Sequence, residues 1–483
     1  MGEYIVIDAG TTSVKLTRFS DGLEILAENA QTYGLIVAGA FTEAPPDSYL
    51  SAVCRGIRQL GDCGHVTAIC ITTQGETLIP LDADGRPLGN AIVWLGKRAP
   101  AEAAELRRSL DDQYFYQKTG LPSVGAALPL CKLLWLRRRR PDLWKKTEKI
   151  MLLEDYLIFW LTGRFVTEKS LQTSTGWFCL ECDSYWDEAL SAAGIPRSFL
   201  PEAINCGDIA GTLLPARADA LGLPGGVRVV AGAMDQTAAA LAAGCSGPGT
   251  LCETTGTAMV AAAWTKAPVF REAHHLTIYR GVTAGSYLYL PISSTAGMAL
   301  KWLKGLLADE AISYRELDRM AASVAAGSEG LLFLPYLSGE VDPVLNENAT
   351  ACFFGLRLPH GRGHLIRAVL EAVGFQLRDF LSMLRSLGCG AEQVCSLGGG
   401  SLSPLWMQIK ADICRLPFLT LRTAQATSYG AAMLTAYAMT GSLPAPLQPA
   451  AQFLPQSGTE AIYERQYELY AKLHAALQPL YLP

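Results

Sequence analysis

The chain has few histidines, and its histidines and cysteines lack the spacing that builds metal centres. Its six histidines show no metal-ligand spacing beside carboxylates or thiols. Of its thirteen cysteines only Cys179 and Cys182 have CxxC spacing, and no second such pair completes a four-thiolate site. The sequence therefore predicts no structural zinc, and we expect the cysteines to be reduced thiols, as is usual in a cytoplasm.

Charge and long apolar runs are also scarce. Charged residues make up 18% of the chain and the formal net charge is −5, which offers no general attraction for nucleic acid or an anionic membrane. The longest stretch of small apolar residues, Val229 to Cys245, contains Asp235 and Gln236, and it is too short and too polar to span a bilayer. The chain opens with a predicted strand rather than an export signal. We expect a cytoplasmic protein without nucleic-acid or membrane partners.

The sequence does contain enough hydrophobic residues for two large domains. A chain of 483 residues, half of them hydrophobic, exceeds what one core usually supports. Strands and helices alternate throughout, which indicates an α/β fold. The turn-rich stretch Gly244 to Gly249 is the best domain boundary. In the first half the predicted strands are Tyr4–Asp8, Val14–Phe19, Glu24–Ala30, Thr67–Thr73, Thr77–Leu81 and Val227–Ala233, and the predicted helices are Ser48–Leu60, Ala101–Leu110, Cys131–Arg140 and Glu154–Leu161.

The first motif with chemical content is a turn between the first two predicted strands. Gly10 allows a tight turn and close approach of a ligand, and Thr11, Thr12 and Ser13 add hydroxyl donors beside backbone N–H groups that can converge on an anion. Asp8 would repel a phosphate directly, so it suits a phosphate site only with Mg²⁺ between the two anions. An ordinary hairpin turn is the alternative, because Asp, Gly and Thr are common in turns.

Two later segments repeat this chemistry. A strand, a turn at Gly256 and Thr257, and a second strand open the second half of the chain, which suggests an ancient duplication. Further on, a strand runs into Gly399 and Gly400, and Ser403 then forms a plausible helix N-cap. A glycine-rich turn at a helix start presents free N–H groups and the positive end of the helix dipole to a ligand. In this order, the three turns favour a nucleotide-phosphate site.

A carboxylate and an amide end the β-branched strand before the boundary. Asp235 is predicted to lie at the carboxyl end of that strand and at the start of a helix, where ligands bind in open α/β sheets. Phosphoryl transfer needs a carboxylate to accept the proton of the attacking hydroxyl, so Asp235 is the candidate base. An N-cap aspartate would satisfy the same position.

The ordered set of motifs resembles the FGGY carbohydrate kinases, which include glycerol kinase and xylulokinase, within the superfamily of actin-like and hexokinase-like ATPases. The resemblance extends from Tyr4 to about Gly441. The segments that carry it are Asp8 to Ser13, Trp94 to Arg98, Gly232 to Gln236, Thr255 to Thr257, Leu334 to Glu340, Arg367 to Glu371, and Gly398 to Gly400 followed by Trp406, Gln408, Ala411 and Asp412.

This resemblance implies two ribonuclease-H-like (actin-like ATPase) domains, with mixed sheets flanked by helices and an interdomain cleft. The expected domains are an N-terminal kinase domain over 1–245, a nucleotide-binding C-terminal domain over 246–445 and a helical extension over 446–483 packed on the C-terminal domain. The expected ligands are ATP, Mg²⁺ and a small sugar. A homodimer is one option for assembly, which the sequence leaves open.

The resemblance also assigns roles to individual residues. Asp235 is the expected catalytic base and Asp8 the expected metal-positioning residue. The expected nucleotide-binding residues are Gly10, Thr11, Thr12, Ser13, Gly256, Thr257, Gly399, Gly400 and Ser403. The expected substrate-binding residues are Gln74, Glu76, Trp94, Asp235 and Gln236.

Substrate choice is less determined by the sequence. Gln74-Gly75-Glu76 matches neither the arginine-glutamate pair of glycerol kinases nor the methionine-histidine-glycine set typical of xylulokinases. Gly96 and Gln425 stand where relatives usually have acidic residues. The indole of Trp94 suits the C–H side of a sugar, although its apolar neighbours also allow a place in the sheet core. The second half is more similar to xylulokinases, so we expect a kinase for a pentulose such as xylulose. The alternatives are another ketose, a polyol, a sugar acid, or a binding module without turnover.

Overall fold

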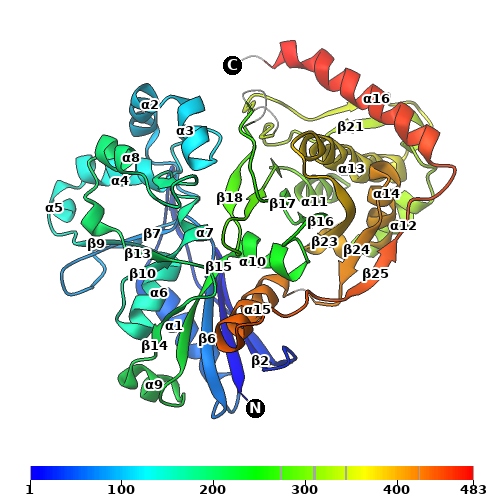
Figure 1. Cartoon of the computed structure of the whole chain (residues 1–483). Coiled ribbons are helices and arrows are strands. Elements are labelled where there is room, and N and C mark those ends of the chain that lie inside the picture. Colours follow the sequence, from blue (N-terminus) through cyan, green and yellow to red (C-terminus); the bar gives the residue numbers. More distant parts are fainter. Residues whose placement is uncertain (1, 272–274, 308–311, 343–344, 424, 482–483) are drawn as a thin grey trace. The chain divides into compact units, whose positions relative to one another are not determined.

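The computed structural model describes residues 2–271, 275–307, 312–342, 345–423 and 425–481. The chain divides into two compact units, shown together in Figure 1. Unit 1 comprises Met1–Ala242, Thr277–Tyr287 and Gln425–Pro446, and unit 2 comprises Ala243–Leu276, Leu288–Ala424 and Leu447–Pro483. Each unit combines a mixed sheet with helices, which confirms the predicted α/β class.

The main sheet of unit 1 has six strands in the order β14-β15-β6-β1-β2-β3. Strand β1 pairs antiparallel with β2 and parallel with β6, and β15 pairs parallel with β6. The carboxyl ends of β15, β6 and β1 therefore lie at one edge of the sheet. Their bounds are β1 Glu3–Ala9, β2 Ser13–Ser20, β3 Ile25–Thr32, β6 Val66–Thr73, β14 Ile209–Thr212 and β15 Arg228–Met234.

Helices cover both faces of this sheet. Ile5 and Ile7 of β1 join the core formed with α1 (Pro46–Arg58) and α6 (Leu153–Thr162). Tyr4 and Val6, which alternate with them, join the core formed with α10 (Asp235–Ala242) and α15 (Ala426–Thr440). Figure 1 shows α15 beside β6, with which it is in contact. Burial on both faces explains why β1 has a continuous apolar run rather than alternating polarity.

A second sheet in unit 1 has the strand order β4-β5-β8-β7-β9 and packs with a separate group of helices. The remaining strands of unit 1 are β4 Ile36–Ala38, β5 Phe41–Ala44, β7 Leu78–Leu81, β8 Ala91–Ile92, β9 Lys149–Leu152, β10 Val166–Glu168, β11 Phe178–Cys179, β12 Ser184–Tyr185, β13 Glu202–Ile204 and β18 Ile278–Arg280. Its remaining helices are α2 Pro100–Ser109, α3 Asp112–Thr119, α4 Pro129–Arg139, α5 Pro141–Trp144, α7 Lys169–Gln172, α8 Asp187–Ala193 and α9 Pro215–Leu221.

Unit 2 repeats the connectivity of the first sheet. Strand β16 pairs antiparallel with β17 and parallel with β23, and β23 pairs parallel with β24. This is the pattern of β1 with β2, β6 and β15, and it supports the predicted duplication. The strands of unit 2 are β16 Gly249–Thr255, β17 Met259–Thr265, β19 Tyr287–Tyr289 (from Leu288 on), β20 Ile292–Ser293, β21 Leu332–Leu334, β22 Cys352–Phe354, β23 Ala391–Leu397, β24 Phe418–Leu421 and β25 Pro449–Phe453.

The helices of unit 2 surround this sheet. They are α11 Gly297–Leu306, α12 Tyr314–Ala322, α13 Arg362–Ser386, α14 Pro404–Cys414 and α16 Glu460–Leu477, with a 3₁₀ turn, η3, over Gly399–Leu402. Helix α16 is in contact with α14 and β21. Within the described ranges, no helix of either unit has the length and apolar character that a membrane span requires.

The first-half strands and helices predicted from the sequence are all present, with ends that differ by at most two residues. Their hydrophobic runs are local signals, so they are readable without knowledge of the fold. The predicted N-cap at Ser403 is also confirmed, because its hydroxyl accepts a hydrogen bond from the Trp406 N–H at 3.1 Å.

Candidate active site

Three adjacent parallel strands of unit 1 deliver polar residues to one sheet edge. Asp8 is the last polar residue of β1 and lies opposite Thr72 of β6, while Gln74 directly follows β6. Asp235 directly follows β15, whose last residue lies opposite Thr73 of β6. The backbone N–H of Gln74 donates to the carbonyl of Ala9 at 3.1 Å, which extends this alignment beyond the strands.

The predicted phosphate turn is a tight β1–β2 connection. The Gly10 N–H donates to the Ser13 carbonyl at 3.0 Å, and the Tyr33 N–H donates to the Thr12 carbonyl at 3.1 Å. The Tyr33 hydroxyl also donates to the Gly10 carbonyl. These bonds use the carbonyls of the turn and leave the side chains of Thr11 and Thr12 partly or fully exposed. The turn can therefore present hydroxyl and N–H donors to an anion.

The side chain of Trp94 lies at this turn rather than in the sheet core. Its indole Nε1–H donates to the Thr11 hydroxyl at 3.1 Å, and the residue is 38% exposed. Of the two interpretations that the sequence allowed for Trp94, the structure favours a surface ring beside the site over a core position.

Three carboxyl groups influence one another at this edge. Burial, together with the charge of Asp8, raises the pKa of Asp235 to about 7. Burial likewise raises the pKa of Glu76 to about 7, with Lys132 lowering it and Asp235 raising it. Burial also raises the pKa of Asp8 to about 6, against a lowering effect of Lys15. A carboxylate with a pKa near neutrality is suited to accept a proton from a hydroxyl.

Side chains from outside β15 bind the backbone that leads to Asp235. The pairing of β15 with β6 is irregular just before Asp235, at Gly232, where a Cβ would lie 2.0 Å from a backbone carbonyl of β6. The Gly232 N–H donates to Glu154 at 3.1 Å, and the Met234 N–H donates to the Ser170 hydroxyl at 3.1 Å. These partners replace the sheet hydrogen bonds that the irregularity removes, and they fix the backbone that positions Asp235.

Glu76 adopts an uncommon backbone conformation. Its φ of 65° lies in the left-handed region, which residues other than glycine rarely occupy. Such strain concentrates at ligand sites, where the surrounding structure imposes it. Gln74 is only 4% exposed, and neither its amide oxygen nor its amide nitrogen has a hydrogen-bond partner in the described part of the chain. Because an unpaired buried amide is costly, Gln74 is a group that a hydroxyl-rich ligand could satisfy.

Lys132 is a site residue that the sequence analysis missed. Its side chain is fully buried, and its Nζ donates to the carbonyls of Val93 at 3.1 Å and Trp94 at 3.0 Å. Burial lowers the pKa of Lys132 to about 8, while Glu76 opposes this shift. The available signal was one lysine inside the apolar helical run Leu130–Leu136, where burial of a charge requires a partner.

In unit 2 the predicted nucleotide-binding residues line one pocket. Its volume is about 650 Å³, within the usual range for small-molecule sites. Gly256, Thr257, Gly399, Gly400 and Ser403 all contribute to its wall. The pocket also includes residues that sequence reasoning did not identify, because they come from the separate helices α11 and α12: Met298, Lys301, Tyr314, Arg315 and Asp318.

Hydrogen bonds hold the turn at Gly256 in place. The Gly297 N–H donates to the Gly256 carbonyl at 3.0 Å, and the Met298 N–H donates to the Thr257 carbonyl at 3.1 Å. Below the turn, the fully buried Lys410 binds Glu253 at 3.0 Å and the Thr255 hydroxyl at 2.9 Å. The end of β16 is therefore fixed from both sides.

Asp8 is the residue of this site that could hold a divalent cation. No group of three or more His, Cys, Asp or Glu side chains able to hold a metal ion occurs among the described residues. Asp8 is buried at a strand end beside the hydroxyl-rich turn. This arrangement fits Mg²⁺, which commonly uses one or two carboxylates together with water and phosphate oxygens, and it does not fit a metal held by protein ligands alone.

Two family models match this chain. The model for the N-terminal domain of the FGGY family of carbohydrate kinases matches residues 3–242, and the model for the C-terminal domain matches residues 251–439. A carboxylate at a strand end, a phosphate-type turn and a nucleotide-sized pocket are the parts of a phosphotransferase. The chain belongs to the FGGY family of carbohydrate kinases, as its motifs predict, and it is a sugar phosphotransferase.

Proteins similar to this chain include xylulose kinases and gluconokinases. The xylulose kinase of Escherichia coli (strain K12) is 31% identical over 499 residues, which cover 99% of each chain. The gluconokinase of Bacillus subtilis (strain 168) is 27% identical and covers 91% of this chain and 88% of its own. The crystal structure of xylulose kinase from Rhodospirillum rubrum has a TM-score of 0.92 at 29% identity, with 99% of each chain covered.

Proposed function

We propose that the protein transfers the γ-phosphoryl group of ATP, in the presence of Mg²⁺, to a hydroxyl of a pentulose such as xylulose. The observation that carries this proposal is the convergence of Asp8, Glu76 and Asp235 at the carboxyl ends of adjacent parallel strands. Asp235 accepts the proton of the attacking sugar hydroxyl. Its raised pKa supports this role, because a base works best with a pKa near the working pH.

The phosphate and nucleotide assignments complete the proposal. Asp8 would hold Mg²⁺, which neutralises phosphate charge when it is bound. We assign a phosphate-binding role to the turn from Gly10 to Ser13 in unit 1 and a phosphate-binding role to Gly256 and Thr257 in unit 2. The unit 2 pocket would take the nucleoside, with its glycine turn at the start of α14. Lys301 and Arg315 line this pocket and could compensate phosphate charge.

The charges around Glu76 and Asp235 favour a neutral sugar over a sugar acid. Both groups are carboxyls, so a substrate carboxylate would meet like charge. The nearby Lys132 amine donates to two backbone carbonyls and is fully buried, which leaves it poorly placed to bind an anionic substrate. Hydroxyl groups can instead donate to the carboxylates and pair with the Gln74 amide. Among the named relatives, this chemistry supports xylulose over gluconate.

The test is a screen for sugar-dependent ADP release. The panel contains D-xylulose, D-ribulose, D-fructose, glycerol and D-gluconate, each with ATP and Mg²⁺. We expect the highest kcat/KM with D-xylulose and little activity with D-gluconate. Preparations of Asp235→Asn made in parallel control for contaminating kinases. A kcat/KM for gluconate above that for every neutral sugar would contradict the proposal.

A further inference from the structure

A short strand from the second half of the sequence belongs to unit 1. Strand β18, Ile278–Arg280, lies within the segment Thr277–Tyr287, which the sequence places after the β16–β17 hairpin of unit 2. In space it contacts α7. Residues of this segment therefore lie beside the N-terminal part of the chain, and no motif in the sequence indicates this position.

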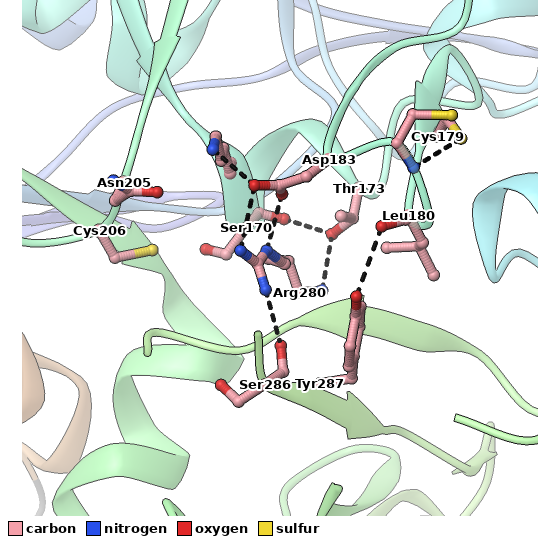
Figure 2. A network of polar contacts seen from close by, with 12 residues as sticks. Ser170, Thr173, Cys179, Leu180, Asp183, Asn205, Cys206, Arg280, Ser286 and Tyr287 are labelled. Atoms are coloured by element: carbon pink, nitrogen blue, oxygen red, sulfur yellow. Dashed lines mark hydrogen bonds and ion pairs between the residues drawn. The ribbon is translucent and has the colours of Figure 1, made fainter. Parts of the chain in front are cut away.

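Both ends of β18 are anchored. On one side the Ile278 N–H donates to the Gly120 carbonyl at 2.8 Å, and a Cβ at Gly120 would lie 2.5 Å from the Ile278 carbonyl oxygen. On the other side Arg280 Nε and Nη2 donate to the two carboxylate oxygens of Asp183 at 2.9 and 3.2 Å, as Figure 2 shows. The Arg280 N–H also donates to the Thr173 hydroxyl at 3.4 Å. A bidentate ion pair of this kind fixes the orientation of the Arg280 side chain.

Two further contacts link β18 to the segment that contains the expected sugar-binding residues Gln74 and Glu76. Thr173, which accepts from the neighbouring Arg280, is followed by Ser174. Ser174 lies against Gly75: a Cβ at Gly75 would lie 3.1 Å from the Ser174 hydroxyl and 3.4 Å from the Met234 sulfur. Tyr279 itself packs against the core that contains Met234, the residue before Asp235.

The electrostatics agree with this placement. Burial raises the pKa of Tyr279 well above its ordinary value, and the charges of Glu76 and Asp235 raise it further. The phenol therefore stays protonated at neutral pH and remains a hydrogen-bond donor. The nearby Tyr287 uses its hydroxyl within the protein, where it donates to the Leu180 carbonyl at 3.5 Å (Figure 2).

We propose that Tyr279 is a sugar-binding residue, whose hydroxyl donates to a substrate oxygen and whose ring faces the apolar side of the sugar. Asp183 and Arg280 act as positioning residues that hold β18. The proposal rests on the proposed function only in taking Glu76 and Asp235 as markers of the sugar site. Tyrosine suits this role because it joins an apolar ring to a polar tip.

The test compares Tyr279→Phe with the matched control Tyr287→Phe, which removes a hydroxyl from the same segment. Both are assayed with the neutral sugar that gives the highest kcat/KM in the ADP-release screen. We expect Tyr279→Phe to raise the sugar KM about three- to tenfold, the scale of one hydrogen bond, with the ATP KM within twofold of wild type. Tyr287→Phe should leave both constants unchanged.

A second measurement separates binding from structure. The sugar-induced rise in melting temperature should be smaller for Tyr279→Phe than for wild type, while the melting temperature without sugar stays the same. An unchanged sugar KM and an unchanged sugar-induced shift would overturn the proposal, as would an equal rise in the sugar and ATP KM values. If another sugar replaces xylulose as the best substrate, the pentulose assignment fails, whereas the comparison for Tyr279 still gives a result.

Discussion

Replacing the proposed base, Asp235→Asn, tests the chemistry most directly. The asparagine keeps the size and the local geometry, in which the side chain accepts from the Gln236 N–H at 2.6 Å, but it cannot take up a proton. We expect kcat to fall by about 10²- to 10⁴-fold, the usual effect of losing a general base. ATP binding should change little, because the nucleotide is assigned to other residues.

The raised pKa of Asp235 also sets the pH dependence of the wild-type enzyme. A base is active when it is deprotonated, and burial together with Asp8 raises the pKa of Asp235 from 3.8 to about 7. The kcat/KM of the wild type should therefore rise with pH and level off above about 7, with roughly a tenfold loss for each unit below that value. With an ordinary aspartate, the profile would be flat above pH 5.

The assay measures ADP by chromatography, so that no coupling enzyme restricts the pH range. The control is Asp84→Asn, since Asp84 is an exposed turn residue paired with Arg86. The reasoning would be refuted if Asp235→Asn kept more than a tenth of the wild-type kcat. A flat wild-type profile between pH 5.5 and 8 would refute the assignment of the raised pKa to the base.

Three further substitutions test the supporting structure. In Gly400→Ala, the added carbon would lie 2.7 Å from the side chain at the end of β16, so the ATP KM should rise several-fold with an unchanged sugar KM; Gly390→Ala, with no atom within 4 Å, is the control. Lys410→Met leaves the Glu253 charge buried without its partner and should lower the free energy of unfolding by about 3–5 kcal/mol in urea denaturation. Adding Glu253→Gln to this variant should restore part of the lost free energy of unfolding. Burial raises the pKa of Glu154 well above its ordinary value of 4.5. Above pH 4.5 the group is therefore ionised in the unfolded chain but still neutral in the folded protein. The wild type consequently loses stability as the pH rises from 4.5 toward the raised pKa. Glu154→Gln should therefore melt at a higher temperature than wild type at pH 8.5, and a gap that does not shrink toward pH 5.5 would contradict this reasoning.

Several parts of the site were predictable because they combine a strand with the turn that follows it. Asp8 and the turn after it lie within six consecutive residues, and Asp235 lies directly after a strand. Hydrophobic runs mark such strands, and small or polar residues mark where they end. The structure brings Asp8, Gln74 and Asp235 to one edge because their three strands run parallel.

Other parts were not predictable, because they depend on contacts between distant segments. The sequence around Lys132 is compatible with an ordinary amphipathic helix. Only the folded structure shows that the Lys132 amine donates to the backbone carbonyl of Trp94. Glu154 reaches Gly232 across 78 positions of the sequence. Such pairings leave no local pattern, since any polar residue in a helix is compatible with exposure to water.

The amino-acid sequence was sufficient to predict the α/β class, the order of the phosphate-type turns and the family of carbohydrate kinases. These follow from local hydrophobic periodicity and from short motifs in a fixed order. The raised pKa values of the carboxyl groups depend on the folded structure, since burial and neighbouring charge arise only when strands and helices assemble. Tyr279, which follows the second nucleotide-type turn in the sequence, packs against the unit 1 core that contains Met234, because the anchors at Gly120 and Asp183 exist only in the folded chain.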